Sequence, residues 1–278
     1  MPTVLITGAS TGIGRATALY LAGRGWTVFA GVRDPLAGER LAADAPAGRV
    51  VALQLDVTDA AELEQARVRI EQDAGGRLDA LINNAGIAIG GPLELVAGED
   101  LRRQFDVNVL AQVAVTRAML PALRSARGRI VFVSSIGGRV AMAFTAPYAA
   151  SKHAIEAIGD ALRVELRSSG VQVALIEPGS VATPIWDKGR AQGDSVSVPP
   201  ELAAQYGHVP AAMDKALERT AQRGVPAEQV AATIAAALSA RRMKARYVIG
   251  SDARAMLLAR RLLPDHLFDR LARRALGV

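Results

Sequence analysis

Tyr148 and Lys152 are the residues of this 278-residue sequence whose types and spacing most directly suggest chemistry. They lie in an alanine-rich run, and in a helix their spacing puts both side chains on one face. A lysine charge beside a phenol favours the phenolate, so we expect the pKa of Tyr148 to fall from its usual value of about 10. Such a phenol is a usable proton donor or acceptor. The same spacing alone also fits an ordinary solvated helix, so the elements that position the pair must decide.

The composition limits the chemistry. Half of the residues are hydrophobic, which is enough for the core of one large α/β domain. The chain has no cysteine and only three histidines, so we expect no disulfide, no thiol catalysis and no metal site. The sequence opens directly on an apolar, strand-like stretch, and no apolar run reaches membrane-spanning length. We therefore expect a cytoplasmic protein.

The net charge of +6 raises the question of nucleic acid. Residues 252–278 carry six arginines against three aspartates, so half of the excess lies at the C-terminus. No basic stripe is interleaved with the aromatic residues that base stacking would use. Nucleic-acid binding is therefore kept only as a third possibility, and we expect no nucleic-acid partner.

The N-terminal stretch predicts a dinucleotide site. Residues 3–6 read as a strand, a glycine-rich turn follows, and a helical pattern runs through Leu21. Glycines 8, 12 and 14 allow a tight turn and a close approach of the backbone to a pyrophosphate. The start of the following helix offers backbone N–H donors to phosphate groups.

The end of the second strand bears on cofactor choice. An acidic residue there would bind the 2′-hydroxyl of NAD, whereas this chain has Val32 and then Arg33. A planar guanidinium suits a 2′-phosphate, which favours NADP(H) and leaves NAD(H) possible. Asp34 follows directly, and its carboxylate would either pair with Arg33 or bind the ribose itself.

The remaining pattern alternates strands and helices. It predicts a Rossmann-type α/β fold, a doubly wound parallel sheet of about seven strands with helices on both faces. We expect a helix over residues 99–120 ended by Pro121, and a dinucleotide-binding catalytic domain over residues 1–250. Residues 183–225 contain several prolines and little periodicity before Ala211, so we expect an irregular substrate cap. Residues 251–278 form a basic amphipathic helical extension of the same domain.

Six motifs in order resemble the short-chain dehydrogenase/reductase family over roughly residues 3–250, and in particular its NADP-preferring, hydroxysteroid- and retinol-dehydrogenase-like members. They are Thr7-Gly8-x-x-x-Gly12-x-Gly14, Asn83-Asn84-Ala85-Gly86, Asn108, Ser135, Tyr148-x-x-x-Lys152 and Pro178-Gly179-x-x-x-Thr183. Each motif is common alone, but together they agree with the predicted fold at several levels. One departure is that the glycine turn offers Ser10 and Thr11 where many NADP-preferring relatives carry a basic residue.

The resemblance implies a role for each catalytic candidate. Tyr148 would exchange a proton with an alcohol or carbonyl oxygen while a hydride moves to or from the nicotinamide. Lys152 would lower the Tyr148 pKa and hold the nicotinamide ribose. Ser135 would orient the reacting oxygen, and Asn108 would tie a water to Lys152 in a proton relay.

The resemblance also implies a set of cofactor contacts, which includes Tyr148 and Lys152 themselves. The other expected contacts are Gly8, Ser10, Thr11, Gly12, Ile13, Gly14, Arg33, Asp56, Val57, Asn84, Ala85, Gly86, Pro178, Gly179, Val181 and Thr183.

The substrate is expected to be a small, fairly hydrophobic alcohol or carbonyl compound. Ile136, Val140 and Val181 are apolar neighbours of the motifs. The side chains of Met142, Phe144, Trp186 and Tyr206 lie where they would line a pocket or the core. No arginine is clearly placed to bind an acidic substrate.

Three further questions stay open in the sequence. A protein that binds NADP without turnover, as a redox sensor or scaffold, is the alternative to an enzyme. By resemblance we expect a homodimer or homotetramer. The C-terminal helices would pack over the substrate entrance or join subunits, and we favour these readings over contact with a membrane surface.

Overall fold

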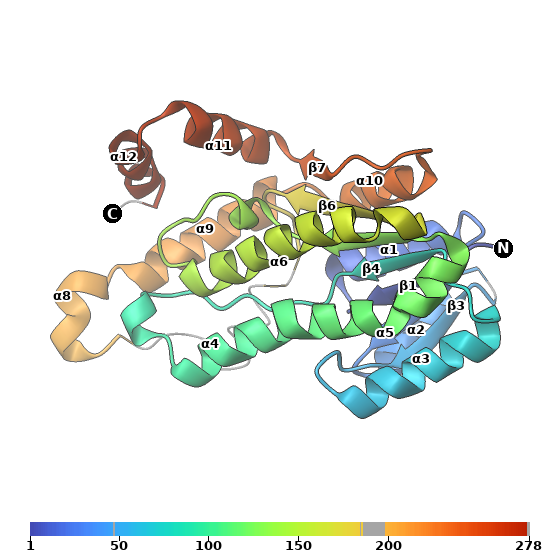
Figure 1. The fold of residues 1–278 in the computed structure, drawn as a ribbon. Helices are drawn as coiled ribbons and strands as arrows, with labels where there is room; N and C mark the ends of the chain where they lie inside the picture. The colour runs from blue at the N-terminus through green and yellow to red at the C-terminus, as the bar shows by residue number, and fades with distance from the viewer. Residues whose placement is uncertain (47, 184, 186–197, 277–278) are drawn as a thin grey trace.

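Runs of apolar residues form the strands of one parallel sheet, which appears at the centre of the fold in Figure 1. The computed structural model describes residues 1–46, 48–183, 185 and 198–276. Within them the strands are β1 (Thr3–Thr7), β2 (Thr27–Val32), β3 (Val50–Gln54), β4 (Ala80–Asn83), β5 (Arg129–Val133), β6 (Gln172–Pro178) and β7 (Arg246–Ile249).

The strand order is β3-β2-β1-β4-β5-β6-β7, and every neighbouring pair is parallel. The chain therefore starts in the middle of the sheet, runs to one edge and returns to build the other half. The order reverses between β1 and β4, and open parallel sheets bind ligands at the strand carboxyl ends beside such a point. The predicted doubly wound α/β fold is confirmed.

Helices connect successive strands and cover both faces. The described helices are α1 (Gly12–Ala22), α2 (Pro35–Asp44), α3 (Ala60–Ala74), α4 (Gly98–Phe105), α5 (Ala111–Ala126), α6 (Ala146–Glu165), α8 (Ala203–Tyr206), α9 (Val209–Arg223), α10 (Ala227–Ser239), α11 (Ser251–Leu262) and α12 (Asp265–Leu276). A π-helical turn spans Asp106–Leu110, and short 3₁₀ turns span Leu93–Leu95, Ile136–Gly138, Arg167–Ser169 and Pro200–Leu202.

The core lies in two layers because successive residues of a strand point to opposite faces. Ile6 packs with the buried residues of α1 and α10 on one face. Its neighbour Leu5 packs with the buried residues of α3, α5 and α6 on the other. Because both faces are covered, the strands are continuously apolar rather than alternating.

The predicted helix over residues 99–120 is wrong in two respects. It is interrupted by the π turn Asp106–Leu110, and Pro121 lies inside α5, which continues to Ala126. Proline removes one helical hydrogen bond. Tertiary contacts hold the last turn nevertheless, because Leu123 is fully buried and the carbonyl of Ala122 accepts a hydrogen bond from the Leu78 amide.

The irregular structure expected before Ala211 is wrong for most of residues 200–210, and the role of residues 183–225 as a substrate cap stays a prediction. The 3₁₀ turn Pro200–Leu202, α8 and α9 occupy most of residues 200–223. Pro210 lies in the first turn of α9, where a missing N–H costs nothing, so this proline begins a helix instead of breaking one. Residues 184 and 186–197 lie outside the described part of the cap.

The C-terminal extension folds back onto the domain (Figure 1). Helix α11 follows β7 directly, and α12 contacts α9 with Phe268 buried. Among the described helices, none combines the length and the apolar composition needed to cross a membrane.

Candidate active site

The carboxyl ends of the strands border a cavity of about 680 Å³. Its walls come from the turns after β1 to β6, together with α4, α6, α9 and α11. Of the residues that the sequence predicted as catalytic or cofactor-binding, all except Gly14 and Asn108 line this cavity. A volume of this size suits a ligand of cofactor or drug dimensions.

The glycine turn is packed against its neighbours too closely for side chains at Gly8 and Gly14. Gly8 has φ +64°, and a Cβ there would lie 2.9 Å from the Ala85 Cα. A Cβ at Gly14 would lie 2.3 Å from the carbonyl oxygen of Gly8 and 2.5 Å from the Asn84 side-chain nitrogen. Gly14 therefore packs the start of α1 under the turn, where only glycine fits, while Ser10, Thr11 and Gly12 line the cavity.

Thr7 and Asn84 hold the turn in place. The Asn84 side-chain amide donates to the carbonyls of Thr7 and Gly8 at 2.9 and 3.1 Å. In return, the Thr7 hydroxyl accepts from the backbone amides of Asn84 and Ala85 at 3.0 Å each. Asn84, directly after β4, is thus bonded to the turn after β1, and its amide nitrogen is committed to support of that turn.

The structure shows the contacts that Asp34 makes after β2 and whether it borders the cavity. The Asp34 carboxylate caps α2 by accepting from the Leu36 amide at 3.0 Å, and it lies 3.5 Å from Arg40. It does not border the cavity, whereas Arg33 does and is exposed there. This arrangement fits a 2′-phosphate better than a ribose hydroxyl.

The turn after β3 is fixed by its own polar contacts. The Asp56 carboxylate accepts from the amide and the hydroxyl of Thr58 at 2.9 and 2.7 Å. Asp56 and Val57 both border the cavity. They follow β3, which lies on the same side of β1 as β2 and Arg33. This position suits contacts with an adenine ring.

Ser135 and Tyr148 meet across the cavity floor. The Ser135 hydroxyl accepts from the Gly137 amide at 3.0 Å and hydrogen-bonds the Tyr148 phenol. Burial raises the pKa of Tyr148, and the hydrogen bond from Ser135 only opposes that rise. The predicted fall in the pKa of Tyr148 is therefore wrong: the phenol is desolvated, which disfavours the phenolate.

Lys152 is buried one turn beyond Tyr148 on α6. Its Nζ donates to the carbonyl of Val133 at 2.8 Å and lies 5.7 Å from the centroid of the Tyr148 ring. Burial lowers the pKa of Lys152 to about 8, against an opposing effect of the Glu156 charge. The Tyr148 phenol and the Lys152 ammonium lie close together as predicted. Burial is nevertheless the largest cause of the pKa shift of each group.

Asn108 lies in the π turn and is fully buried. Its side-chain oxygen accepts from the Ile87 amide at 2.8 Å, and its nitrogen donates to the Ile87 carbonyl at 2.9 Å and to the Ser151 hydroxyl at 3.1 Å. The expectation that an amide in this apolar stretch must find partners is confirmed. Its part in a relay to Lys152 stays a prediction.

The expected substrate-pocket residues are placed unevenly. Ile136 and Val181 border the cavity. Val140, Met142, Phe144 and Tyr206 do not; the Tyr206 hydroxyl donates instead to Glu94 at 3.0 Å. Trp186 lies outside the described residues.

Sequence reasoning missed two walls of the cavity. One is the face of α4 and the π turn formed by Glu99, Arg102, Arg103 and Asp106, so arginines do border the site. Their spacing of three and four residues was the available signal. The other is the start of α11, where the Asp252 carboxylate accepts from the Ser180 amide at 2.8 Å beside Gly179.

No group of three or more acidic or histidine side chains in the described residues is arranged to hold a metal ion. The lining of the cavity includes proton donors, cationic side chains and the backbone amides of the glycine turn. The chemistry that such groups support is phosphate binding and proton transfer.

The chain was compared with known proteins. The family model for short chain dehydrogenase matches residues 2–194. An NADPH-dependent 3-dehydrocapnine reductase of Ornithobacterium rhinotracheale is 36% identical, over 98% of this chain and 96% of that protein. Retinol dehydrogenase 5 of Mus musculus is 34% identical, over 96% of this chain and 86% of its own.

The fold has close counterparts among solved structures. A short chain dehydrogenase from Burkholderia cenocepacia J2315, in complex with NADP, has a TM-score of 0.75 and 28% identity, over 97% of each chain. The family model, the relatives and the fold agree with the motifs placed around the cavity. The chain belongs to the short-chain dehydrogenase/reductase family of oxidoreductases.

Proposed function

We propose that this protein is an NADP(H)-dependent oxidoreductase that interconverts an alcohol and a ketone or aldehyde on a fairly hydrophobic substrate. The observation that carries the proposal is the convergence of Ser135, Tyr148 and Lys152 on the same cavity as the glycine turn and Arg33. When bound, the nicotinamide cofactor supplies or accepts a hydride. The protein binds the cofactor and the substrate in one cavity, and it supplies or accepts the proton.

The proton is held on the Tyr148 phenol. Because burial raises its pKa, Tyr148 is protonated at neutral pH, which is the form that protonates a carbonyl oxygen as it becomes an alcohol. In the opposite direction the alcohol proton passes to the phenolate. The Ser135 hydroxyl, bonded to the phenol, is placed to bind the same oxygen and orient it.

Lys152 acts beside the cofactor. Its ammonium borders the cavity next to Tyr148 and is placed to hold the nicotinamide ribose. Pro178, Gly179, Val181 and Thr183 border the same end of the cavity and would contact the carboxamide. A preference for NADP(H) is supported by Arg33 and by the NADPH dependence of the reductase relative.

The proposal is tested by following NADPH oxidation over a panel of hydrophobic ketones and aldehydes. Tyr148→Phe removes only the hydroxyl, so we expect kcat/KM to fall by about 10² to 10⁴-fold while NADPH binding persists. A Tyr148→Phe variant as active as the wild type would overturn the mechanism. NADPH binding without turnover of any substrate would favour the redox-sensor alternative.

The assembly and location are also proposals. We infer a homodimer or homotetramer because Leu110, next to α5, and Val164 on α6 are large apolar residues that are mostly exposed. Light scattering after size-exclusion chromatography tests this inference. A cytoplasmic location stays a prediction, for which fractionation of cells is the test.

The basic C-terminal helices are proposed to serve the active site, as part of the same domain. Met256 on α11 borders the cavity, which supports packing over the entrance. Flotation with liposomes, comparing the full chain with one ending near Gly250, tests the membrane alternative. Equal behaviour of the two chains would remove it.

A further inference from the structure

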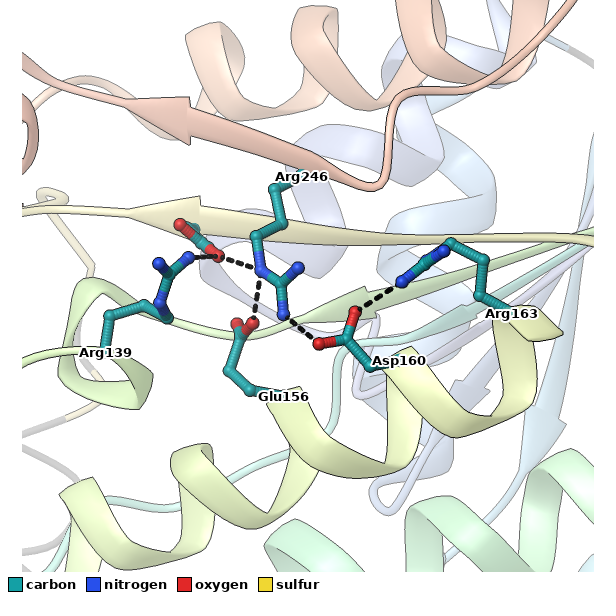
Figure 2. A network of polar contacts seen from close by, with 6 residues as sticks. Arg139, Glu156, Asp160, Arg163 and Arg246 are labelled. Atoms are coloured by element: carbon teal, nitrogen blue, oxygen red, sulfur yellow. Dashed lines mark hydrogen bonds and ion pairs between the residues drawn. The ribbon is translucent and has the colours of Figure 1, made fainter.

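A cluster of charged side chains lies between α6, β6 and β7 (Figure 2), and its residues do not line the cavity. Arg246 of β7 is at its centre. Its guanidinium lies 2.9 Å from Glu156, 3.0 Å from Glu177 and 2.6 Å from Asp160. Arg139, in the loop after β5, lies 3.2 Å from Glu177, and the exposed end is closed by Arg163 at 3.0 Å from Asp160.

Two carboxyl groups of this cluster are removed from water and face one another. Glu177 is 0% exposed and Glu156 is 5% exposed. The same Nε of Arg246 lies within 3.0 Å of Oε2 of Glu156 and Oε1 of Glu177. In the described structure, the other oxygens, Oε1 of Glu156 and Oε2 of Glu177, are buried and receive no hydrogen bond from a donor. Two buried carboxylates held this close cannot both ionise at low cost.

A shared proton resolves this conflict. A protonated carboxyl group is itself a donor, so one proton between Glu156 and Glu177 gives the pair the hydrogen bond that it lacks. The titration agrees with this geometry: burial, and next the Glu156 charge, raise the pKa of Glu177 to about 7, against the opposing effect of Arg139. Asp160, at the exposed end and beside two arginines, has a lowered pKa and stays ionised.

The pair is joined directly to the active-site segments. Glu156 lies one turn beyond Lys152 on the same face of α6, and its charge raises the pKa of Lys152 against the effect of burial. Glu177 directly precedes Pro178 and Gly179. A Cβ at Gly138 would lie 2.9 Å from the Glu156 side chain, the Lys152 carbonyl and the Ser134 hydroxyl, so the loop carrying Ser135 packs on this same turn of α6.

We propose that Glu156 and Glu177 share one proton and act as positioning residues for Lys152 and the Pro178–Gly179 turn. The inference rests on the role proposed for Lys152 above. While the proton is present, the pair carries one negative charge. When it leaves for solvent near neutral pH, a second charge appears beside Lys152, which favours the ammonium. The pair thereby keeps Lys152 charged over a wider pH range than its buried position alone would allow.

The first test asks whether the proton exists, and it needs no substrate or cofactor. Because the pKa of Glu177 is raised from 4.5 to about 7 by folding, stability from this group falls as pH rises through that window. We expect Glu177→Gln to remove this fall in melting temperature between pH 5 and 8, and Glu156→Gln, which removes only the second cause of the raised pKa, to reduce it. Glu165→Gln, an exposed glutamate on α6, is the matched control and should follow the wild type.

Profiles of both Gln variants that run parallel to the wild type would overturn the shared proton. If neither variant folds, infrared spectra of the wild-type protein between pH 5 and 9 provide the same information. Loss of one protonated-carboxyl band near pH 7 supports the pair, and no such band overturns it.

The second test asks whether the pair acts on Lys152. We expect Glu156→Gln to move the alkaline loss of NADPH binding, measured by fluorescence, about one pH unit lower, while Glu165→Gln leaves it in place. An unmoved binding profile, with an altered melting profile, would overturn the positioning role. If the wild-type protein binds no NADPH, the proposed function fails, and the melting profiles still decide whether the proton is shared.

Discussion

The Nζ of Lys152 donates a hydrogen bond to the carbonyl of Val133 at 2.8 Å. Val133 ends β5 just before the serine pair, so this bond ties the middle of α6 to the strand that carries Ser135. Tyr148, one turn earlier on α6, is thereby held at a fixed distance from Ser135. Lys152 is also buried, and burial of its charged ammonium reduces the free energy of unfolding.

We predict that the destabilisation caused by burial of Lys152 depends on pH. Folding lowers the pKa of Lys152 from 10.5 to about 8, so the folded state binds fewer protons than the unfolded state between these values, and stability from this group rises with pH there. Lys152→Met removes the titration. The difference in free energy of unfolding between variant and wild type should change by up to about 3 kcal/mol from pH 8 to 10.5.

Urea denaturation at several pH values measures this difference. A constant difference across the range would show that Lys152 titrates normally in the folded protein.

Arg33 should control cofactor preference. Arg33→Ala removes the guanidinium that borders the cavity at the end of β2, so NADPH binding should weaken by about 10 to 100-fold, while NADH binding changes little. Arg40→Ala is the matched control, because Arg40 is exposed and pairs with Asp34. Isothermal titration with both cofactors measures the preference, and equal losses for NADPH and NADH would contradict the assignment.

Gly14 should tolerate no side chain. A Cβ there would lie 2.3 Å from the Gly8 carbonyl oxygen, so Gly14→Ala must displace the turn that is placed to bind phosphate. We expect a loss of about 1–3 kcal/mol of stability and weaker NADPH binding. Gly98→Ala, at the start of α4 where nothing lies within 4 Å, is the control and should melt like the wild type or higher. Unchanged melting and binding of Gly14→Ala would refute this account.

Asp252 should position the loop after β6. Its carboxylate accepts from the Ser180 amide at 2.8 Å, and both of its oxygens lie close against Gly179. Asp252→Ala releases this loop, so kcat/KM should fall by about tenfold or more, in line with the cost of misplacing groups at a reacting centre. Asp269→Ala, exposed on α12, is the control. Steady-state kinetics with NADPH measures both variants. If Asp252→Ala is as active as Asp269→Ala, the loop keeps its conformation without the Asp252 carboxylate.

Much of the fold was predictable because the strands are buried on both faces and read as continuous apolar runs. Polar residues after these runs, such as Asn84, Ser135 and Asp56, marked the edge of the sheet where the cavity lies. The glycine turn was predictable for a different reason, since its glycines serve backbone conformations and close contacts that no other residue provides.

Other features depend on burial and long-range contact, which the sequence does not display. The pKa of Tyr148 rises because the phenol is desolvated, a quantity that depends on the folded surroundings. The Glu156–Glu177 pair forms only when α6 and β6 pack with Arg246 between them. Pro121 was expected to end a helix, yet it lies within one held by tertiary packing, and Pro210, one of the prolines that favoured an irregular cap, lies in the first turn of α9.

The π turn Asp106–Leu110 joins α4 to α5 without a loop between them. An α-helix turns by about 100° per residue, and a π turn holds one residue more than an α turn. The turn therefore sets the rotation of α4 relative to α5, and Asn108 fixes it through Ile87. The buried residues of α5 pack in the core, whereas Glu99, Arg102 and Arg103 of α4 border the cavity. The turn thus lets one helical segment of the chain direct one face at the core and a differently rotated face at the cavity.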